Sequence, residues 1–241
     1  MSSQQFKKYS HLEHVLKLPD TYIGSIEKSN EEHYILNDDE TKMDKKNIQY
    51  TPGEYKIFDE ILVNALDHYI RIKEKNIQGY DFSPVKNIKI YYSIEEGYIS
   101  VLNDGEGIPI ELHESENVYV PELIFGHLLT SGNYEKKQKH TGGKNGYGGK
   151  LANIFSKEFI IETIDHNKGL KYTQRFYNNM ASKDKPTITK NKGKPYTKIT
   201  YYPDFERFGH KSLEKDMVKL ITKRTYDAAA VTDTSVNIFL N

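Results

Sequence analysis

A glycine-rich segment near the middle of the chain limits most strongly what this sequence can fold into. Residues 142–150 read GGKNGYGGK and contain five glycines and two lysines. The P-loop pattern G-x-x-x-x-G-K-[ST] does not fit, because it needs a glycine at Lys144 and a Ser or Thr at Leu151. The pattern G-x-G-x-x-G does not fit either, since Gly146 and Gly148 are followed by Leu151. A nucleotide held here needs another architecture, and the alternative is a flexible loop.

The composition is that of one globular domain. A chain of 241 residues can bury a sizeable core, and it contains no repeats or long linkers. Lys+Arg and Asp+Glu are both 34, so the net charge does not indicate binding to nucleic acid by this chain alone. The absence of cysteine excludes disulfides and thiolate metal sites, and no signal peptide or membrane-length apolar run is found. We therefore expect an intracellular protein without a membrane partner.

The pattern of apolar residues predicts an α+β fold. Residues 54–75 have apolar side chains at helical spacing after Pro52 and Gly53. Alternating runs at 87–94 and 98–103 predict a β-hairpin. The remaining expected elements are helices at 121–129, from about Lys150, and at 211–229, and strands at 158–164, 170–177, 186–190, 196–202 and 235–240. This order favours a largely antiparallel sheet covered on one face by helices.

Three polar residues share one face of the first long helix. Glu60, Asn64 and Asp67 are spaced i, i+4 and i+7. Apolar residues next to them make it difficult for this face of the helix to be fully exposed to solvent. A solvated edge of an amphipathic helix is one interpretation. The functional interpretation is a carboxylate that orients or deprotonates a water, beside an amide oxygen that ligates Mg²⁺.

A second candidate site follows the strand at 98–103. Residues 103–109 read NDGEGIP, which by itself is a turn signal. Its glycines also allow the backbone to approach a flat ligand, while Asp104 offers an acceptor. A buried carboxylate of this kind can select the exocyclic amine of adenine, because an analogue without the amine leaves the acceptor unpaired.

The glycine-rich segment is the third candidate site. Its glycines can direct several backbone N–H groups at phosphate oxygens where a helix begins, and Lys144 and Lys150 add positive charge. A disordered basic loop is the alternative, but the glycines stop where an apolar helix starts. Each motif is weak in isolation, whereas their order and spacing together are specific.

Together, the three motifs resemble the nucleotide-binding motifs of the GHKL ATPase superfamily, which includes gyrase B, heat-shock chaperones of the ninety-kilodalton class and MutL-type proteins. Residues 12–16 (LEHVL), 19–25 (PDTYIGS), 56–65 (KIFDEILVNA) and 142–156 (GGKNGYGGKLANIFS) resemble eukaryotic-type DNA topoisomerase II more narrowly. The resemblance covers essentially the whole chain. It implies the GHKL, or Bergerat, ATPase fold, with a mixed and largely antiparallel sheet.

The resemblance also implies a domain organisation. Residues 1–25 form the N-terminal arm and the start of the ATPase domain, and residues 26–241 form the rest of that domain. The family's transducer, TOPRIM and DNA-cleavage domains lie outside this chain, so the transducer lysine that reaches the γ-phosphate is missing and hydrolysis by this chain alone is expected to be weak. The implied partners are a second subunit, joined on ATP binding through the arm before Leu12, and duplex DNA through the full-length enzyme. The implied location is the nucleus or, for a viral protein, the host cytoplasm.

The resemblance further implies a role for each motif residue. Glu60 is the general base for the water that attacks the γ-phosphate, and Asn64 ligates Mg²⁺. Asp104 reads adenine with help from Thr197. The residues implied for ATP binding are Asn64, Asp67, His68, Asp104, Gly107, Ile108, Ser131, Gly132, Asn133, Gly143, Lys144, Asn145, Gly146, Tyr147, Gly148, Gly149, Lys150 and Thr197.

Three residues depart from the family pattern. His68 and Asp104 stand where eukaryotic relatives usually have Asn, and Gly132 replaces the second Ser of a Ser-Ser-Asn run. Two other functions stay open, namely an ATP-dependent clamp of chaperone or mismatch-repair type and a degenerate scaffold without nucleotide binding. The PDTYIGS segment argues against the clamp, and the presence of Glu60 and Asn64 argues against the scaffold.

Overall fold

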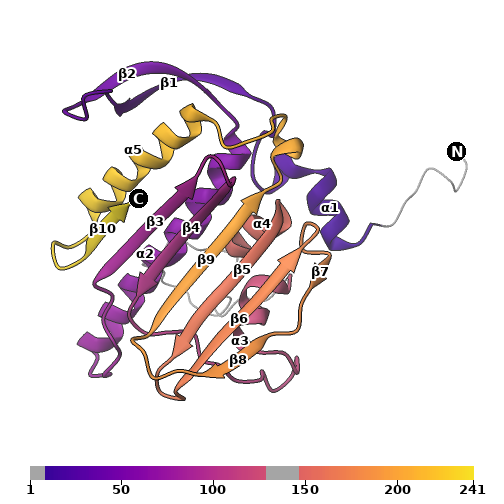
Figure 1. Cartoon of the computed structure of the whole chain (residues 1–241), viewed down its shortest axis with the longest axis vertical. Helices are drawn as coiled ribbons and strands as arrows, with labels where there is room; N and C mark the ends of the chain where they lie inside the picture. Colours follow the sequence, from indigo (N-terminus) through magenta and orange to yellow (C-terminus); the bar gives the residue numbers. More distant parts are fainter. Residues whose placement is uncertain (1–8, 129–146) are drawn as a thin grey trace, which may run out of the picture.

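The fold is built on one mixed sheet. The computed structural model describes residues 9–128 and 147–241 (Figure 1). The strands of the sheet are β3 (Asn87–Ser93), β4 (Tyr98–Asp104), β5 (Ser156–Asp165), β6 (Leu170–Tyr177), β7 (Ser182–Lys183), β8 (Thr187–Lys190), β9 (Tyr196–Pro203) and β10 (Asn237–Leu240). Their order is β10-β3-β4-β9-β5-β6-β7, with β8 beside β6. Within the described residues, β10 and β3 pair in parallel and the other pairs are antiparallel, which confirms the predicted fold class.

Helices cover one face of this sheet. The five α-helices named in the described residues are α1 (His11–Lys17), α2 (Pro52–Ile77), α3 (Val120–Gly126), α4 (Gly148–Ile154) and α5 (Lys215–Val231). Figure 1 shows α2, α3 and α4 behind the strands. The long helix α2 buries Phe58, Leu62 and Ala65 of the predicted apolar stripe, and Leu66 and Tyr69 pack on the same core. Among the described residues, no helix has the length and apolar character needed to cross a bilayer.

Two predicted helices are shorter than expected. The helix predicted at 121–129 ends at Gly126, because His127 is already extended at φ −120° and ψ 120°. The helix predicted at 211–229 begins only at Lys215. A short 3-10 helix, Phe205–Phe208, precedes it and ends at Gly209, whose φ of 79° favours glycine.

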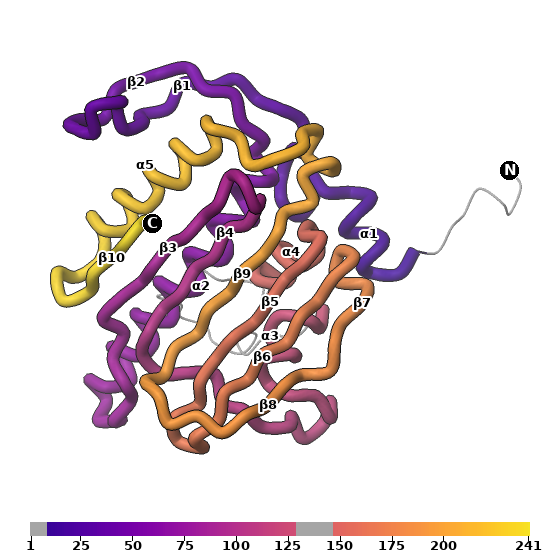
Figure 2. The backbone as a smooth tube through the Cα atoms, viewed as in Figure 1, coloured from indigo at the N-terminus to yellow at the C-terminus, as the bar shows by residue number. Residues whose placement is uncertain are grey.

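Helix α1 and the first hairpin are among the elements that were not predicted from the sequence. Ser10 caps the N-terminus of α1 and forms a capping box with Glu13. The sequence signal for such a cap is a Ser followed three residues later by a Glu. The hairpin of β1 (Ser29–Leu36) and β2 (Met43–Tyr50) lies across α5 in Figure 2. It is attached by a small core of Ile35, Ile48 and Tyr50 against Leu220.

A buried ion pair holds the start of α2 to the segment before α5. His210 Nε2 lies 2.9 Å from Glu54 Oε2, and the two side chains are 4% and 2% exposed. Burial opposes the charged imidazole, but the hydrogen bond and charge of Glu54 outweigh it and raise the pKa of His210. Burial also raises the pKa of Glu54. The folded pair therefore keeps its shared proton to a higher pH than the unfolded chain does.

This pair predicts that the protein loses stability as the pH rises above about 6.5. Between the ordinary histidine pKa of 6.5 and the raised pKa of His210, the folded state binds more protons than the unfolded state. The free energy of unfolding should therefore fall as pH rises through this window, by up to about 1.4 kcal/mol per pH unit. Urea unfolding at several pH values tests this, and His210→Gln should remove the slope. A slope unchanged in His210→Gln would contradict the assignment.

Candidate functional site

The polar face of α2 meets the glycine-rich start of α4. A Cβ atom added to Gly148 would lie 1.9 Å from Glu60 Oε2, and one added to Gly149 would lie 3.3 Å from Asn64 Nδ2. Glycine is required at Gly148 because any side chain there would displace the Glu60 carboxylate. Two of the three predicted motifs are therefore brought into direct contact.

Charged groups surround this contact. Glu60 Oε1 lies 2.5 Å from the ammonium nitrogen of Lys56, and the Glu60 side chain is 20% exposed. Lys150, in the first turn of α4, is 2% exposed, and its burial lowers the pKa to about 8. The site thus holds a partly screened carboxylate and a buried amine whose pKa is lowered by desolvation.

Tyr147, just before α4, connects the glycine segment to the N-terminal part of the chain. Its ring centroid lies 5.9 Å from that of His11 in α1 and 6.4 Å from that of Tyr22. Tyr22 OH is also 3.0 Å from His14 Nδ1. A shift of α4 would therefore move Tyr147 and change its ring contact with His11 of α1.

Three polar side chains, from Asn103, Thr197 and Thr163, form a row on the apolar, helix-covered face of the sheet, and we call them the polar row. The register places Asn103 of β4 opposite Thr197 of β9, and Thr197 opposite Thr163 of β5. Side chains alternate along a strand, so these three residues share a face with the buried core residues Ile99 and Val101. Thr163 and Thr197 are linked through their hydroxyl oxygens at 3.0 Å. Asn103 is only 6% exposed, which leaves its amide facing the space between sheet and helices.

The Asp104 carboxylate, which the sequence predicts to read adenine, binds the start of β3 in this structure. Oδ1 accepts hydrogen bonds from the backbone N–H groups of Lys86 at 2.7 Å and Asn87 at 2.8 Å. Oδ2 accepts a third from the Asn87 side chain at 2.5 Å. Asp104 lies on the opposite face of β4 from Asn103 and fixes the start of β3. Asn103 and Thr163 are the site residues that the sequence interpretation missed, and the alternation of Ile99, Val101 and Asn103 was the available signal.

The loop after β4 presses closely on β5. A Cβ atom at Gly107 would lie 1.9 Å from the carbonyl oxygen of Ile164. The next residue, Ile108, donates its backbone N–H to Thr163 Oγ1 at 3.0 Å. Ile110 N–H donates to the buried carboxylate of Asp165 at 3.0 Å. Gly107 therefore allows the loop to pack directly on β5, beside Thr163 of the polar row.

The last residues of the α2 motif form a cluster with Arg71. His68 Nδ1 lies 2.6 Å from Arg71 Nη2. Burial, and secondly the charge of Arg71, lower the pKa of His68 to about 4. Asp67 is close enough to raise the pKa of Arg71, although burial lowers it overall. His68 is thus held uncharged near neutral pH, one helical turn beyond Asn64.

Part of the predicted site lies outside the described residues. These positions are Ser131, Gly132, Asn133, Gly143, Lys144, Asn145 and Gly146. Their predicted contacts with the sugar and phosphates stay predictions. The described part brings Glu60, Asn64 and the α4 glycines together, and the polar row lies on the helix-covered face of the sheet.

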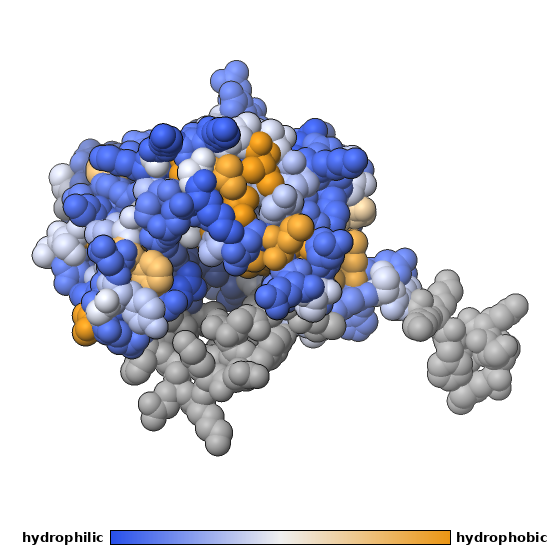
Figure 3. All heavy atoms as spheres, turned by 90° about the horizontal axis from the view of Figure 1, so that it is seen from below, coloured by the Kyte–Doolittle hydropathy of each residue, from blue (hydrophilic) through white to orange (hydrophobic). Residues whose placement is uncertain are grey.

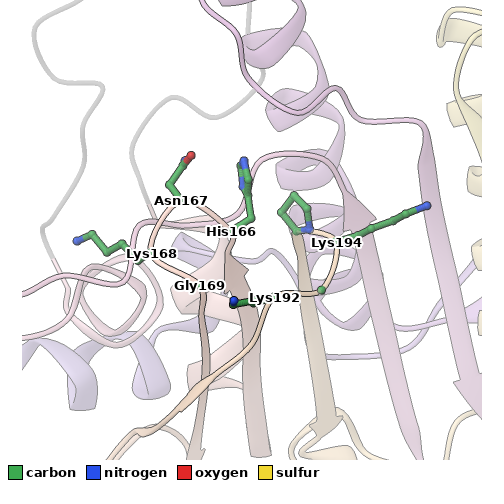
Figure 4. Close-up of a pocket in the computed structure, with 8 residues that line it drawn as sticks. His166, Asn167, Lys168, Gly169, Lys192 and Lys194 are labelled. Atoms are coloured by element: carbon green, nitrogen blue, oxygen red, sulfur yellow. The ribbon is translucent and has the colours of Figure 1, made fainter.

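An open pocket of about 570 Å³ lies beside the site, between the turn 166–169 and the loop 192–195. Asn167 Nδ2 donates to Glu106 Oε1 at 2.9 Å, which ties this turn to the loop after β4. Figure 4 shows Lys168 and Lys194 pointing in opposite directions, so the pocket has no convergent set of cations. Figure 3 shows this end of the molecule as mostly polar, with apolar side chains in small separate groups. We therefore place the candidate site at α2, α4 and the polar row.

Comparison with known proteins gives matches over the whole chain. It is 48% identical to DNA topoisomerase 2 of Saccharomyces cerevisiae over 243 residues and 47% identical to that of Acanthamoeba polyphaga mimivirus over 238 residues. The solved ATPase region of the yeast enzyme matches 100% of the chain with a TM-score of 0.91 and 48% identity. The ATPase domain of Thermus thermophilus gyrase B, crystallised with an aminocoumarin, shares the fold, with a TM-score of 0.64 and 21% identity over 95% of the chain. No family model matches the chain.

The match covers only part of these relatives. The chain spans 16% and 18% of the length of the yeast and mimivirus enzymes, and 61% of the solved yeast ATPase region. The similarity therefore concerns the ATPase region, and the arrangement of its α and β elements agrees with the GHKL fold of the neighbouring structures.

Proposed function

Because this chain is homologous to the ATPase region of DNA topoisomerase II, we propose that it binds ATP with Mg²⁺ and hydrolyses the γ-phosphate. One observation carries the proposal: the Glu60 carboxylate lies against the glycine turn of α4, where a Cβ at Gly148 would approach Glu60 Oε2 to 1.9 Å. The Glu60 carboxylate and the backbone of the glycine turn therefore lie side by side. This arrangement suits a base that acts on a water attacking a phosphate held at the turn.

Glu60 is the proposed general base of the reaction. Its carboxylate accepts a proton from the attacking water, while Lys56, 2.5 Å away, limits the freedom of the side chain. Lys150 supplies a cation whose burial cost falls when a phosphate lies beside it. Hydrolysis then depends mainly on positioning and charge stabilisation.

Asn64 is the proposed protein ligand of Mg²⁺. Its half-buried side chain lies one turn beyond Glu60 on α2, with Nδ2 near Gly149, and Oδ1 of the same amide is the proposed ligand atom. Mg²⁺ prefers oxygen donors and commonly takes one or two protein ligands together with phosphates and water. When bound, the ion neutralises negative charge on the phosphate oxygens.

Adenine is proposed to bind at the polar row of the sheet. Asn103 has an amide oxygen that can accept from the exocyclic amine, and Thr197 lies opposite it on β9. Gly107 lets the loop after β4 pack on β5 next to Thr163, so that Ile108 N–H can bond to Thr163 Oγ1. The acceptor is therefore Asn103, in place of Asp104.

Replacing Asn103 and Asp104 one at a time by alanine separates the proposed adenine-binding role from the structural one. Asn103→Ala should weaken binding of an ATP analogue by about tenfold or more, because the amine loses a buried acceptor. Asp104→Ala should leave this affinity within about threefold but lower the free energy of unfolding by about 1–3 kcal/mol, since three donors lose their acceptor. Calorimetric titration and urea unfolding of both variants measure the two effects. A large loss of affinity in Asp104→Ala with Asn103→Ala unaffected would restore the original assignment.

We also propose that ATP closes a homodimer that acts on duplex DNA through the full-length enzyme. The contacts of Tyr147 with His11 and Tyr22 support a link between the nucleotide segment and the N-terminal arm. A ligand can shift the dimer equilibrium only if it binds the closed form more tightly.

Dimer closure is tested by sedimentation with and without a non-hydrolysable ATP analogue. The analogue should convert monomer to dimer in the wild-type protein, and deletion of residues 1–11 should abolish the shift while nucleotide binding persists. A wild-type protein that binds the analogue and stays monomeric at high concentration would rule out ATP-driven closure.

A further inference from the structure

The charge of this chain is unevenly distributed along the sequence. Residues 183–198 contain six lysines and a single acidic residue, Asp184, which gives this stretch a net charge of +5 in a chain whose total is zero. Four of the lysines are exposed, and we call them the basic edge: Lys185, Lys190, Lys192 and Lys194. A locally basic surface can attract a polyanion even where the whole chain is neutral.

The ammonium groups of the basic edge are not neutralised within the described part of the protein. None of the four forms an ion pair with a residue in the ranges 9–128 and 147–241. Other lysines nearby do have such partners, since Lys183 Nζ lies 2.5 Å from Glu122 Oε1 and Lys171 Nζ lies 2.7 Å from Glu162 Oε2. The basic edge is therefore a group of cations whose counter-ions come from outside these residues.

Backbone contacts hold the basic edge in place. Figure 1 shows β7 and β8 along the outer side of β6, and both strands pair with it. Beyond β8, the Asn191 N–H donates to the carbonyl oxygen of Gly169 at 2.8 Å, and the Gly193 N–H donates to Asn191 Oδ1 at 2.7 Å. The loop that carries Lys192 and Lys194 is thus already shaped before a ligand arrives, which reduces the entropy cost of binding.

The placement of these lysines suits an extended polyanion better than a small anion. Lys192 and Lys194 line the open pocket, whereas Lys185 and Lys190 precede them along the sheet edge. A chain along a sheet edge rises about 3.3 Å per residue, so the basic edge covers a length on the order of 20 Å. Figure 4 shows Lys168 and Lys194 pointing apart, so these cations do not surround one phosphate.

We propose that the basic edge binds the phosphate backbone of duplex DNA, so that this chain itself contacts the DNA. The proposed function assigns the DNA contact only to the full-length enzyme, and the inference does not depend on the nucleotide site. Duplex DNA carries one negative charge per about 1.7 Å of helix axis, and lysines that neutralise its phosphates release condensed counterions. An acidic protein segment fits less well, because protein interfaces rely on buried apolar anchors and the four residues of the edge are exposed and charged.

One competing role for these lysines is protection of the sheet edge. Lysines on an exposed edge strand discourage pairing with another chain. That role accounts for Lys185 and Lys190, which lie just before β8 and at its end. It does not account for Lys192 and Lys194, which lie beyond the strand. Substitution of these last two residues therefore separates the two roles.

The experiment is a fluorescence anisotropy titration of labelled duplex DNA with the whole chain, without nucleotide and at several salt concentrations. The logarithm of the binding constant should fall linearly with the logarithm of salt concentration, with a slope of about −3 to −4 for four phosphate contacts. Lys192→Gln combined with Lys194→Gln should weaken binding at low salt by about tenfold and make the slope shallower by about two.

A matched double variant controls for net charge. Lys42→Gln combined with Lys45→Gln removes the same charge from the β1–β2 hairpin, where Lys42 pairs with Asp44 and Lys45 with Glu32. This variant should keep the DNA affinity within about twofold and the slope unchanged. Urea unfolding should be unchanged in both double variants, because all four substituted side chains are exposed. Polyglutamate added at equal charge concentration should displace the DNA at least about tenfold less effectively than unlabelled duplex, because a flexible chain loses more entropy on binding.

Three results would overturn the inference. Wild-type protein that does not bind duplex DNA at low salt would exclude the site. Equal losses in the two double variants would show an effect of net charge alone, and equal displacement by polyglutamate would identify an acidic peptide as the partner. Each of these results leaves the proposed function intact, because the titration contains no nucleotide.

Discussion

Replacing Glu60 by Gln is expected to lower the rate of ATP hydrolysis by about 10²–10⁴-fold, because the proposed general base loses its ability to take a proton. The amide is almost the same size as the carboxylate, so the close packing against Gly148 is kept. Affinity for an ATP analogue should stay within about threefold if the carboxylate acts mainly in the transition state. Turnover is measured with the full-length protein, and affinity by calorimetry.

Lys56→Met provides the matched control for this substitution. Glu60→Gln removes both the base and the charge partner of Lys56, whereas Lys56→Met removes only the ion pair. Turnover in Lys56→Met should change by less than about tenfold, since exposed ion pairs contribute little. A Glu60→Gln protein with normal turnover would exclude Glu60 as the base, and a large loss of affinity would place the carboxylate among the groups that bind ATP in its ground state.

Replacing Gly107 by Ala is expected to lower the free energy of unfolding by about 3 kcal/mol and to abolish nucleotide binding. The new Cβ would lie 1.9 Å from the backbone oxygen of Ile164, which cannot move without distorting β5. Overpacking against backbone typically costs about 1–3 kcal/mol, and the loop must shift away from the polar row. Urea unfolding and titration with an ATP analogue measure the two effects.

Gly193→Ala is the control for the general effect of a methyl group. Its Cβ would approach the far end of the Asn191 side chain at 2.8 Å, and a side chain can rotate away. We expect a loss of less than about 1 kcal/mol and unchanged nucleotide affinity. If Gly107→Ala behaved like Gly193→Ala, the close contact of the loop with β5 would be refuted.

The sequence predicts the main elements of the fold because their apolar periodicity is strong. Helix α2 and the hairpin of β3 and β4 lie where the pattern places them. The hairpin of β1 and β2 was missed because both strands are mostly polar. Its burial depends on the contact of Ile35 and Ile48 with Leu220, almost two hundred residues away in sequence. Such a long-range contact leaves little local signal.

The same distinction holds for the candidate site. The motifs on α2 and at the start of α4 lie together in the structure, which packs Gly148 against Glu60. Reading NDGEGIP as a motif nevertheless selected the stronger acceptor, Asp104, over its neighbour. The alternation of Ile99, Val101 and Asn103 was the signal that Asn103 faces the core, whereas its partner Thr197 is known only from the strand pairing.

The most direct test of the central claim is a calorimetric titration of the full chain with AMP-PNP, with and without Mg²⁺. The account predicts saturable binding of one nucleotide per chain that Mg²⁺ strengthens, because Asn64 and the phosphates share the ion. Absence of binding in both conditions would contradict the claim that α2, α4 and the polar row form a nucleotide site.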